Sequence, residues 1–267
     1  MKKWNTTISK KYFFKLYSLV EHQDWLLDKD EAFKDLWKEC DNDDKKDLII
    51  DLLNRFFFLR PKKREEIECI IFNELKDKFD LTKSVFLPLA DQSRQDGSVW
   101  ESYNFRQHFL QELSSTFYND IKGCQQCKSD SDIILIDDFI GSGDKIIKKI
   151  KYLNTLVQKN IIACICPVGM KEGVERLREE YPSITFIVPK LLKKGITDYD
   201  RNADYRKQII KMLSEGIGIK EIEKFLGYNN SEALFSYEKY KNIPNNVFPL
   251  FWSRNKKGIK RLFMRKK

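Results

Sequence analysis

Two adjacent carboxylates and a Gly-Ser-Gly loop stand together in the middle of the chain, in IILIDDFIGSGDKI (133–146). Asp137 and Asp138 directly follow four apolar residues, a run that predicts a buried β-strand. The loop then leads into a segment with the apolar spacing of a helix. Because α/β proteins bind ligands at the carboxyl ends of parallel strands, we take these residues as the candidate site.

The loop has the chemistry of an anion-binding turn. Unpaired backbone N–H groups at a helix start, together with the helix dipole, favour a phosphate there. Gly141 and Gly143 let the backbone close around it, and Ser142 adds a hydroxyl donor. The carboxylates would face hydroxyl groups or a cation. A phosphorylated sugar accompanied by Mg²⁺ meets both demands.

Three other nucleotide- or phosphate-related patterns fit less well. A Walker A loop needs GxxxxGK[ST], which this segment lacks. A dinucleotide-binding GxGxxG pattern matches at Gly141 and Gly143, but its third position is Ile146. A receiver domain also has paired acids after a strand, yet it needs a phosphoacceptor aspartate after a later strand. The later apolar runs here end in CPVG and VPK.

The elements that must position this site alternate between strands and helices, which predicts an α/β fold with a parallel sheet covered on both faces. In this central region we expect strands at 84–90, 132–137, 160–168 and 183–190, and helices at 105–120, 144–158 and 170–181. Outside it we expect helices at 30–40, 43–59, 63–79 and 205–216 and a sheet-edge strand at 231–238. The predicted division is a helical region (1–82), an α/β core (83–199) and a C-terminal extension (200–267).

The central segment resembles the phosphoribosyl pyrophosphate (PRPP) motif of type I phosphoribosyltransferases, in which four apolar residues, two acids and two apolar residues precede a small-residue loop. The resemblance implies a Rossmann-like core with a hood-like C-terminal extension. It implies that Asp137 and Asp138 contact the ribose hydroxyls, and that Mg²⁺ arrives with PRPP rather than on a protein metal site. The implied 5′-phosphate loop comprises Gly141, Ser142, Gly143, Asp144 and Lys145.

The sequence departs from that motif in two places. The last loop position, usually threonine, is Lys145, which we expect to offset the negative charge of Asp144. The slot of the pyrophosphate loop, 90–98, lacks the family's usual glycine-rich or Arg-Gly form, and its nearest cations are Arg94 and Arg106. Two functions therefore stay open. One is an enzyme that transfers or cleaves at ribose C1, and the other is a non-catalytic ribose-phosphate or nucleotide sensor.

The C-terminal region, with GYNNSEALFSYE and NIPNNVFPLFW, resembles a group of bacterial phosphoribosyltransferase-like proteins encoded beside antiphage conflict systems, including retrons. That resemblance implies a defence effector with protein partners. It also implies a hood in which Asn245, Asn246 and Trp252 touch a base or a partner. The alternative is that the aromatic residues of this region simply pack in a core, which their type favours.

Charge is concentrated at the C-terminus. The net charge is +9, and the last 15 residues hold eight basic and no acidic residues. A basic run with interleaved apolar residues is typical of nucleic-acid binding, so residues 254–267 are candidates for an RNA or DNA contact, with Leu262, Phe263 and Met264 between the charges. A solvated basic terminus is the alternative interpretation.

Composition indicates a reduced, cytoplasmic protein. No run approaches the 18 apolar residues of a membrane span, and the N-terminus lacks the apolar core of a signal peptide. The six cysteines are scattered. Cys124 and Cys127 form one CxxC pair without a second pair at zinc-site spacing, so we interpret them as plain thiols.

Overall fold

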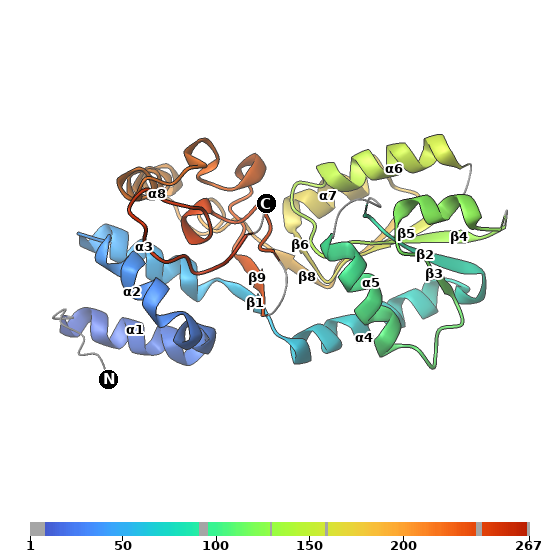
Figure 1. Cartoon of the computed structure of the whole chain (residues 1–267), viewed down its shortest axis with the longest axis horizontal. Helices are drawn as coiled ribbons and strands as arrows, with labels where there is room; N and C mark the ends of the chain where they lie inside the picture. Colours follow the sequence, from blue (N-terminus) through green and yellow to red (C-terminus); the bar gives the residue numbers. More distant parts are fainter. Residues whose placement is uncertain (1–8, 91–95, 129, 158–159, 239–241, 266–267) are drawn as a thin grey trace. The chain divides into compact units, whose positions relative to one another are not determined.

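A computed structural model describes residues 9–265, except 91–95, 129, 158–159 and 239–241 (Figure 1). The chain divides into two compact units, each assembled from segments that are distant in sequence. Unit 1 comprises Met1–Phe58, Lys194–Ser236 and Asn245–Lys267, and unit 2 comprises Leu59–Lys193 and Tyr237–Pro244. The candidate site lies entirely within unit 2.

Unit 2 is built on a five-stranded sheet with the order β3-β2-β4-β5-β7, in which all pairings are parallel. Its strands are β2 (Ser84–Pro88), β3 (Thr116–Phe117), β4 (Asp132–Ile136), β5 (Ile161–Ile165) and β7 (Thr185–Ile187). The central strand β4, which leads into the two aspartates, is paired on both sides. The predicted parallel α/β architecture is confirmed.

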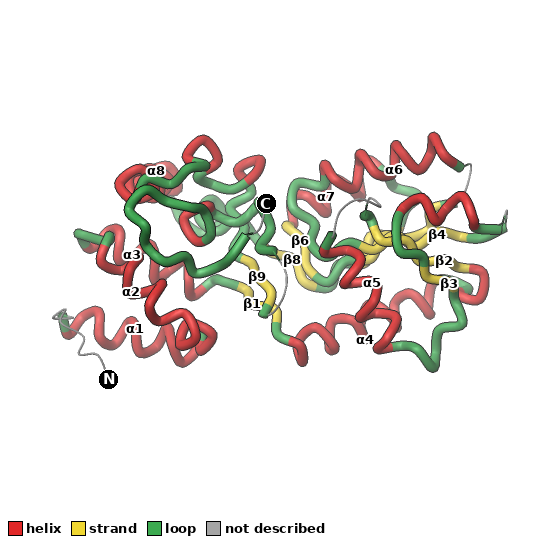
Figure 2. Tube along the Cα trace, viewed as in Figure 1, coloured by secondary structure: helices red, strands yellow, loops and turns green. Residues whose placement is uncertain are grey.

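Both faces of this sheet are covered, which explains why its strands are continuously apolar. On β2, Val85 and Leu87 belong to a buried cluster that includes Ile146 and Ile150 of α6. Phe86 points the other way, and its ring centroid lies 5.9 Å from that of Phe105 on α5. Figure 2 shows the strands of this sheet between α6 on one side and α4 and α5 on the other.

In the described part of unit 2 there are four α-helices, and two of them begin with clear local signals. The four helices are α4 (Pro61–Lys78), α5 (Gly97–His108), α6 (Asp144–Leu156) and α7 (Lys171–Glu180). Pro61 is tolerated at the first position of α4, where no helical N–H partner is needed. The Asp96 side chain caps α5 by accepting from the Ser98 backbone N–H at 3.0 Å.

Two small sheets complete the strand pattern. β6 (Val168–Met170) pairs with β8 (Lys190–Leu192), and β1 (Phe57–Leu59) pairs with β9 (Phe235–Tyr237). Short 3₁₀ helices lie between the larger elements, at η1 (Asp24–Lys29), η2 (Leu81–Lys83), η3 (Ile121–Gln126), η4 (Ile222–Lys224), η5 (Tyr228–Asn230) and η6 (Pro249–Phe251).

Unit 1 is mainly helical, with α1 (Lys10–His22), α2 (Asp30–Lys38), α3 (Asp43–Asn54) and α8 (Ala203–Ile217). Its core is rich in aromatic rings. Phe263, near the C-terminus, stacks on Phe56 at a centroid distance of 5.1 Å and lies 5.3 Å from Trp25. Within the described part of the chain, every helix falls short of the length and apolar character that a bilayer crossing requires.

Three element predictions were wrong. The helix expected at 105–120 is α5, Gly97–His108, because the Asp96 cap starts it earlier and Phe109 leaves the helical conformation. The helix expected at 43–59 ends at Asn54, since the aromatic residues Phe57–Leu59 form a strand instead. The strand expected at 231–238 is the shorter β9, which pairs with β1 rather than with the edge of the main sheet.

Candidate functional site

Three carboxylates meet beyond the carboxyl end of β4. Asp137 and Asp138 follow the strand directly, and Asp96 comes from the start of α5, where it is also the helix cap. One carboxylate oxygen from each lies within 4.8 Å of the others. We call these three residues the carboxylate cluster.

Lys145, from the first turn of α6, inserts its ammonium among these acids. Its Nζ donates to Asp137 Oδ1 at 2.8 Å and to Asp96 Oδ1 at 2.9 Å. The expectation that Lys145 offsets Asp144 was therefore wrong, because its side chain turns toward the strand end. The cluster with Lys145 carries three negative charges and one positive charge if all four groups are ionised.

Burial sets the protonation chemistry of this group. Asp137 is 1% exposed, and that burial raises its pKa to about 7, with Asp138 and Asp96 adding to the shift and Lys145 opposing it. Burial alone would lower the pKa of Lys145, but the carboxylates, Asp137 first, outweigh it and the pKa rises above its ordinary value. Lys145 is therefore a permanent cation, whereas Asp137 can exchange a proton near neutral pH.

Asp138 has different surroundings from its neighbour. It is only partly buried, and its Oδ2 accepts a hydrogen bond from the Tyr237 hydroxyl at 2.9 Å. Burial, reinforced by Asp138, keeps the pKa of Tyr237 well above its ordinary value, so the phenol stays protonated and donates. The carboxylate also requires Gly97, because a Cβ there would lie 1.9 Å from Asp138 Oδ2.

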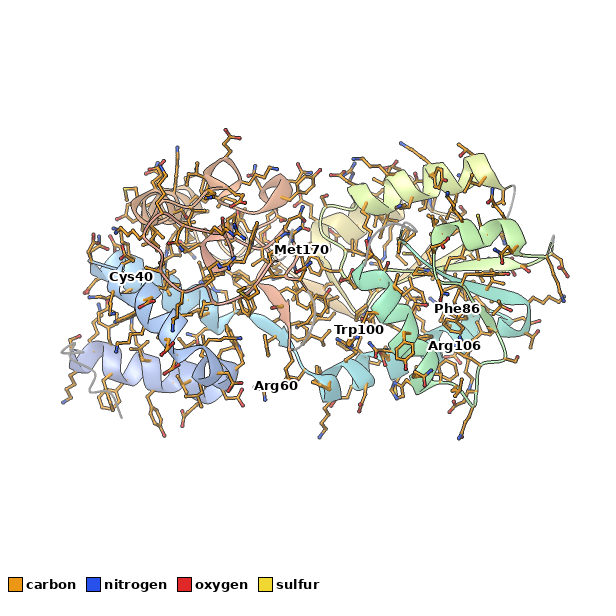
Figure 3. All side chains as sticks on the ribbon, viewed as in Figure 1. Cys40, Arg60, Phe86, Trp100, Arg106 and Met170 are labelled. Atoms are coloured by element: carbon orange, nitrogen blue, oxygen red, sulfur yellow. The ribbon has the colours of Figure 1, made fainter. Side chains whose placement is uncertain are left out.

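The loop between the acids and α6 is held by the neighbouring sheet. Ile140 donates to the Val168 carbonyl at 3.1 Å and accepts from the Met170 N–H at 2.7 Å. Figure 3 labels Met170, which ends β6. Gly143 then takes a left-handed conformation, φ +85°, as the N-cap of α6. The backbone turn is thus fixed at the helix start, where N–H groups lack helical partners.

Asp144 is neutralised from α7 rather than by its neighbour. Arg176 donates to Asp144 Oδ1 at 2.8 Å and to the Ser142 carbonyl at 3.1 Å. The Ser142 hydroxyl in turn donates to Asp144 Oδ2 at 2.9 Å. Gly173 permits this approach of α7, because a Cβ there would lie 1.9 Å from the Gly141 carbonyl oxygen. These contacts tie down the Asp144 carboxylate within the loop.

The two predicted pyrophosphate-side cations are not brought to the carboxylates. Arg94 lies outside the described residues. Arg106 is exposed in the last turn of α5, and its guanidinium carbon is 5.8 Å from the Phe117 ring centroid (Figure 3). It follows Gly97 by nine residues, which is about 14 Å along a helix axis.

The predicted hood contacts belong to unit 1, where their polar groups have local partners. The Trp252 indole N–H donates to the Val247 carbonyl at 2.9 Å, and the side chain is 8% exposed. Asn246 is buried, and its amide nitrogen is 3.4 Å from the Tyr228 carbonyl oxygen. The Asn245 carbonyl accepts from the Tyr228 N–H at 2.8 Å. From the described part of the C-terminal third, Tyr237 contacts Asp138 through its hydroxyl.

The basic C-terminal segment is folded into unit 1. Leu262 and Phe263 are buried, at 2% and 6% exposed, while Met264 is exposed. Lys257 pairs with Glu39 and Lys260 with Glu31. In this arrangement, two of the three apolar residues proposed to interleave at a nucleic-acid contact are core residues.

The carboxylate cluster has the oxygen ligands that Mg²⁺ prefers. However, the Lys145 ammonium already lies within 3 Å of two of its three carboxylates. A cation bound by the same oxygens would have to displace it. These residues therefore fit a metal that is carried by a ligand's own phosphates better than one held by the protein alone.

Sequence reasoning found the acids and the loop but missed Asp96, Tyr237 and Arg176. Asp96 had a local signal, since Asp-Gly-Ser is typical of a helix start. Tyr237 lies 99 positions from Asp138, and no short-range pattern could have linked them. Arg176 had no distinguishing signal among the many basic residues.

A parallel sheet with paired acids after its central strand and a glycine loop at the next helix defines a phosphoribosyltransferase-like α/β protein. The model of the PRTase-CE family matches residues 33–265, and the chain belongs to this phosphoribosyltransferase-like family. A search of curated protein sequences gave no match. Among solved structures, the AQ2163 protein from Aquifex aeolicus aligns at 11% identity and a TM-score of 0.35, over 61% of this chain and 84% of its own.

Proposed function

We propose that the site in unit 2 binds PRPP or a related ribose 5-phosphate, with Mg²⁺ carried on the ligand's pyrophosphate. The observation that supports this most directly is the arrangement of the partly exposed Asp138 carboxylate beside the loop that starts α6. A ribose hydroxyl can donate to Asp138. The first N–H groups of α6, which have no partners within the helix, and the helix dipole suit the 5′-phosphate.

The two acids then have different tasks. Asp138, oriented by Tyr237, is the direct hydroxyl acceptor. Asp137 is almost fully buried and accepts a hydrogen bond from Lys145 Nζ at 2.8 Å, so it holds Lys145 at the ribose side of the site. There the ammonium can stabilise negative charge on an anionic ligand before and during transfer at C1.

A second candidate is a sensor that binds ribose phosphate without turnover. Lys145 favours it, because an ammonium already satisfies carboxylates that would otherwise meet the ligand's metal. Both candidates share the ligand and differ in chemistry. A role as an effector in antiphage defence, in a retron-type system, is the cellular setting that the sequence resemblance suggests for either.

The test is calorimetric titration of PRPP with Mg²⁺ into the wild type and into Asp138→Asn, with Asp130→Asn as a matched control on an exposed carboxylate of the same unit. We expect binding in the wild type and the control, and at least about tenfold weaker binding in Asp138→Asn, since a charge-assisted hydrogen bond is lost. Equal affinity in all three proteins would contradict the proposal.

Turnover separates the two candidates. Purified protein with PRPP, Mg²⁺ and a panel of nucleobase and amine acceptors is assayed for pyrophosphate release. Release that depends on Asp138 supports the enzyme, and binding without release supports the sensor. For the defence setting, cells carrying the whole system are challenged with phage, and we expect Asp138→Asn to lose protection that Asp130→Asn keeps.

A further inference from the structure

A second group of reactive side chains lies between α4 and α5, apart from the carboxylate cluster. The His108 imidazole, at the end of α5, joins two neighbours from α4. Its Nδ1 is 2.8 Å from Glu68 Oε2, and its Nε2 is 4.0 Å from the Cys69 sulfur. A carboxylate, an imidazole and a thiol are therefore arranged in sequence.

We propose that Glu68, His108 and Cys69 form a nucleophilic thiol site, in which His108 takes the proton of Cys69 and Glu68 positions the imidazole. The substrates of this chemistry are small soft electrophiles, of which low-molecular-weight disulfides are the class we assign. The site does not depend on ribose-phosphate binding.

The geometry meets the general requirement for an activated nucleophile, namely a base within reach of it and a third group that orients the base. An ionised Glu68 accepts from Nδ1–H, which leaves Nε2 as the acceptor that faces the thiol. A separation of 4.0 Å is long for a hydrogen bond but is typical of the looser contacts found without substrate. Cys69 is exposed, so an electrophile can reach it.

The imidazole is held firmly enough to serve as a base. Its ring stacks on Phe109 with a centroid distance of 4.4 Å and an interplanar angle of 20°. Phe109 stacks in turn on the buried Phe72 at 4.1 Å. The ring is not buried away from solvent, because the His108 side chain is 30% exposed.

Glu68 is an unusual residue for a purely structural ion pair. Its side chain is 3% exposed, and its second oxygen, Oε1, accepts no hydrogen bond from the described residues. Leaving a buried carboxylate oxygen unpaired costs about 1–3 kcal/mol, which a simple packing role does not explain. Glu68 and His108 also line a pocket of about 470 Å³ with Arg64, Trp100 and Asn104. Cys69 is not among the described residues that line this pocket, so an electrophile reaches the thiol from its exposed face rather than through the pocket.

The charges around Glu68 give the site a pH dependence. Burial, reinforced by Glu101 and opposed by His108 and Arg64, raises the pKa of Glu68 to about 7. Below that pH, a protonated Glu68 donates to Nδ1 and places the imidazole proton on Nε2, where it blocks proton transfer from Cys69. Above that pH, Nε2 of His108 carries no proton and can accept the proton of Cys69. The contribution of Glu68 therefore grows as the pH rises through 7.

The reaction with a disulfide RSSR balances without another reactant. The thiol proton passes to Nε2, and the Cys69 sulfur forms a bond to one sulfur of RSSR while the S–S bond breaks. The other sulfur leaves as RS⁻ and takes the proton from His108. Cys69 is oxidised to a mixed disulfide, and the departing sulfur is reduced to a thiol.

The experiment follows alkylation of each cysteine by iodoacetamide in the full-length protein, using peptide mass spectrometry, with glutathione disulfide as the second probe. The chain supplies internal references, because four cysteines are buried (Cys40, Cys124, Cys164 and Cys166) and Cys127 is partly buried. At pH 7, where an unperturbed thiol with a pKa of about 8.5 is only about 3% thiolate, we expect Cys69 to react at least about fivefold faster than the same cysteine in the denatured chain. A rate equal to the denatured rate would overturn the proposal.

Variants separate chemistry from packing. His108→Ala should lose the rate advantage and regain part of it with added imidazole. Tyr103→Ala, at an exposed position of the same helix outside the pocket lining, should leave the rate unchanged. Glu68→Gln should react more slowly than the wild type, by a ratio that grows between pH 6 and pH 8. Full reactivity in His108→Ala, or a pH-independent ratio for Glu68→Gln, would contradict the assigned roles.

Discussion

Two charge-rich regions of this protein, the carboxylate cluster with Lys145 and the C-terminal basic segment, are held in opposite ways. In the cluster the charges themselves make the contacts, and Asp137 is buried with its ion pair. In the basic segment, apolar side chains enter the core while Lys257 and Lys260 remain about half exposed. A charge-rich segment can therefore be held in the fold either by contacts of its charged groups or by burial of its apolar side chains, and its charge alone does not show which.

The largest expected loss of stability comes from removing the aromatic ring that packs the basic segment into the core of unit 1. Phe263→Ala removes a ring that packs against Phe56 and Trp25, and we expect a loss of about 3–5 kcal/mol in the free energy of unfolding. Urea denaturation monitored by tryptophan fluorescence measures it. Met264→Ala, at an exposed neighbour, is the control and should change stability by less than about 0.5 kcal/mol.

The next effect concerns the cluster. Lys145→Ala leaves three carboxylates within 4.8 Å without the ammonium that joins two of them. We expect a loss of about 2–3 kcal/mol, at or below the lower end for breaking a buried pair, because Asp137 is buried but the Lys145 side chain is 38% exposed. Uptake of a proton by Asp137 also limits the loss. Lys148→Ala, on an exposed face of the same helix, should stay within about 0.5 kcal/mol. Similar stabilities for the two variants would mean that Lys145 is not the counter-charge of the cluster.

A third prediction sharpens the cluster's dependence on pH. The folded-state pKa of Asp137, about 7, lies above the ordinary 3.8, so the folded protein keeps a proton that the unfolded chain has lost. The neutral Asp137 carboxyl contributes its full stabilisation at a pH below the ordinary pKa of 3.8. This contribution is lost as the pH rises through the folded-state pKa of about 7. The Asp137→Asn variant has an amide that does not titrate at this position. The unfolding free energy of the wild type relative to the variant should therefore fall by at most about 1.4 kcal/mol per pH unit between pH 4 and pH 7.

Urea titrations at pH 5, 6 and 7 measure that difference. A difference that increases with pH would show that the Lys145 ion pair dominates over burial, and would reverse our assignment of the protonation state.

The smallest effect on stability is expected from the lysines of the basic segment. Lys257→Ala with Lys260→Ala removes two surface ion pairs and should cost less than about 1 kcal/mol each. If the segment contacts RNA or DNA, the same variant should reduce the slope of log affinity against log salt by about one for each lost phosphate contact. These substitutions are a cleaner test than deleting 254–267, which would also remove Phe263 from the core.

The sequence predicted the parts of the site that lie close together in the chain, but not the contacts between distant segments. The strand-acid-loop-helix order from Ile133 to Ile146 is encoded locally, by an apolar run, two acids, glycines and helical spacing, and it folded as expected. The predicted start of helix α5 was wrong because Asp96, which caps the helix, was assigned to the pyrophosphate loop at 90–98. That error also hid Asp96 from the site, since its carboxylate reaches Asp137 and Asp138 only through the packing of α5 beside the sheet.

The sequence by itself determined the parallel α/β class, the two adjacent acids and the loop at the start of α6, because apolar periodicity and glycine chemistry act over a few residues. Only the tertiary structure decided which charges meet. It turned Lys145 toward Asp137, brought Tyr237 to Asp138 from a distant segment, and placed His108 between Glu68 and Cys69. Such meetings arise from the packing of elements far apart in the chain, which no short-range pattern encodes.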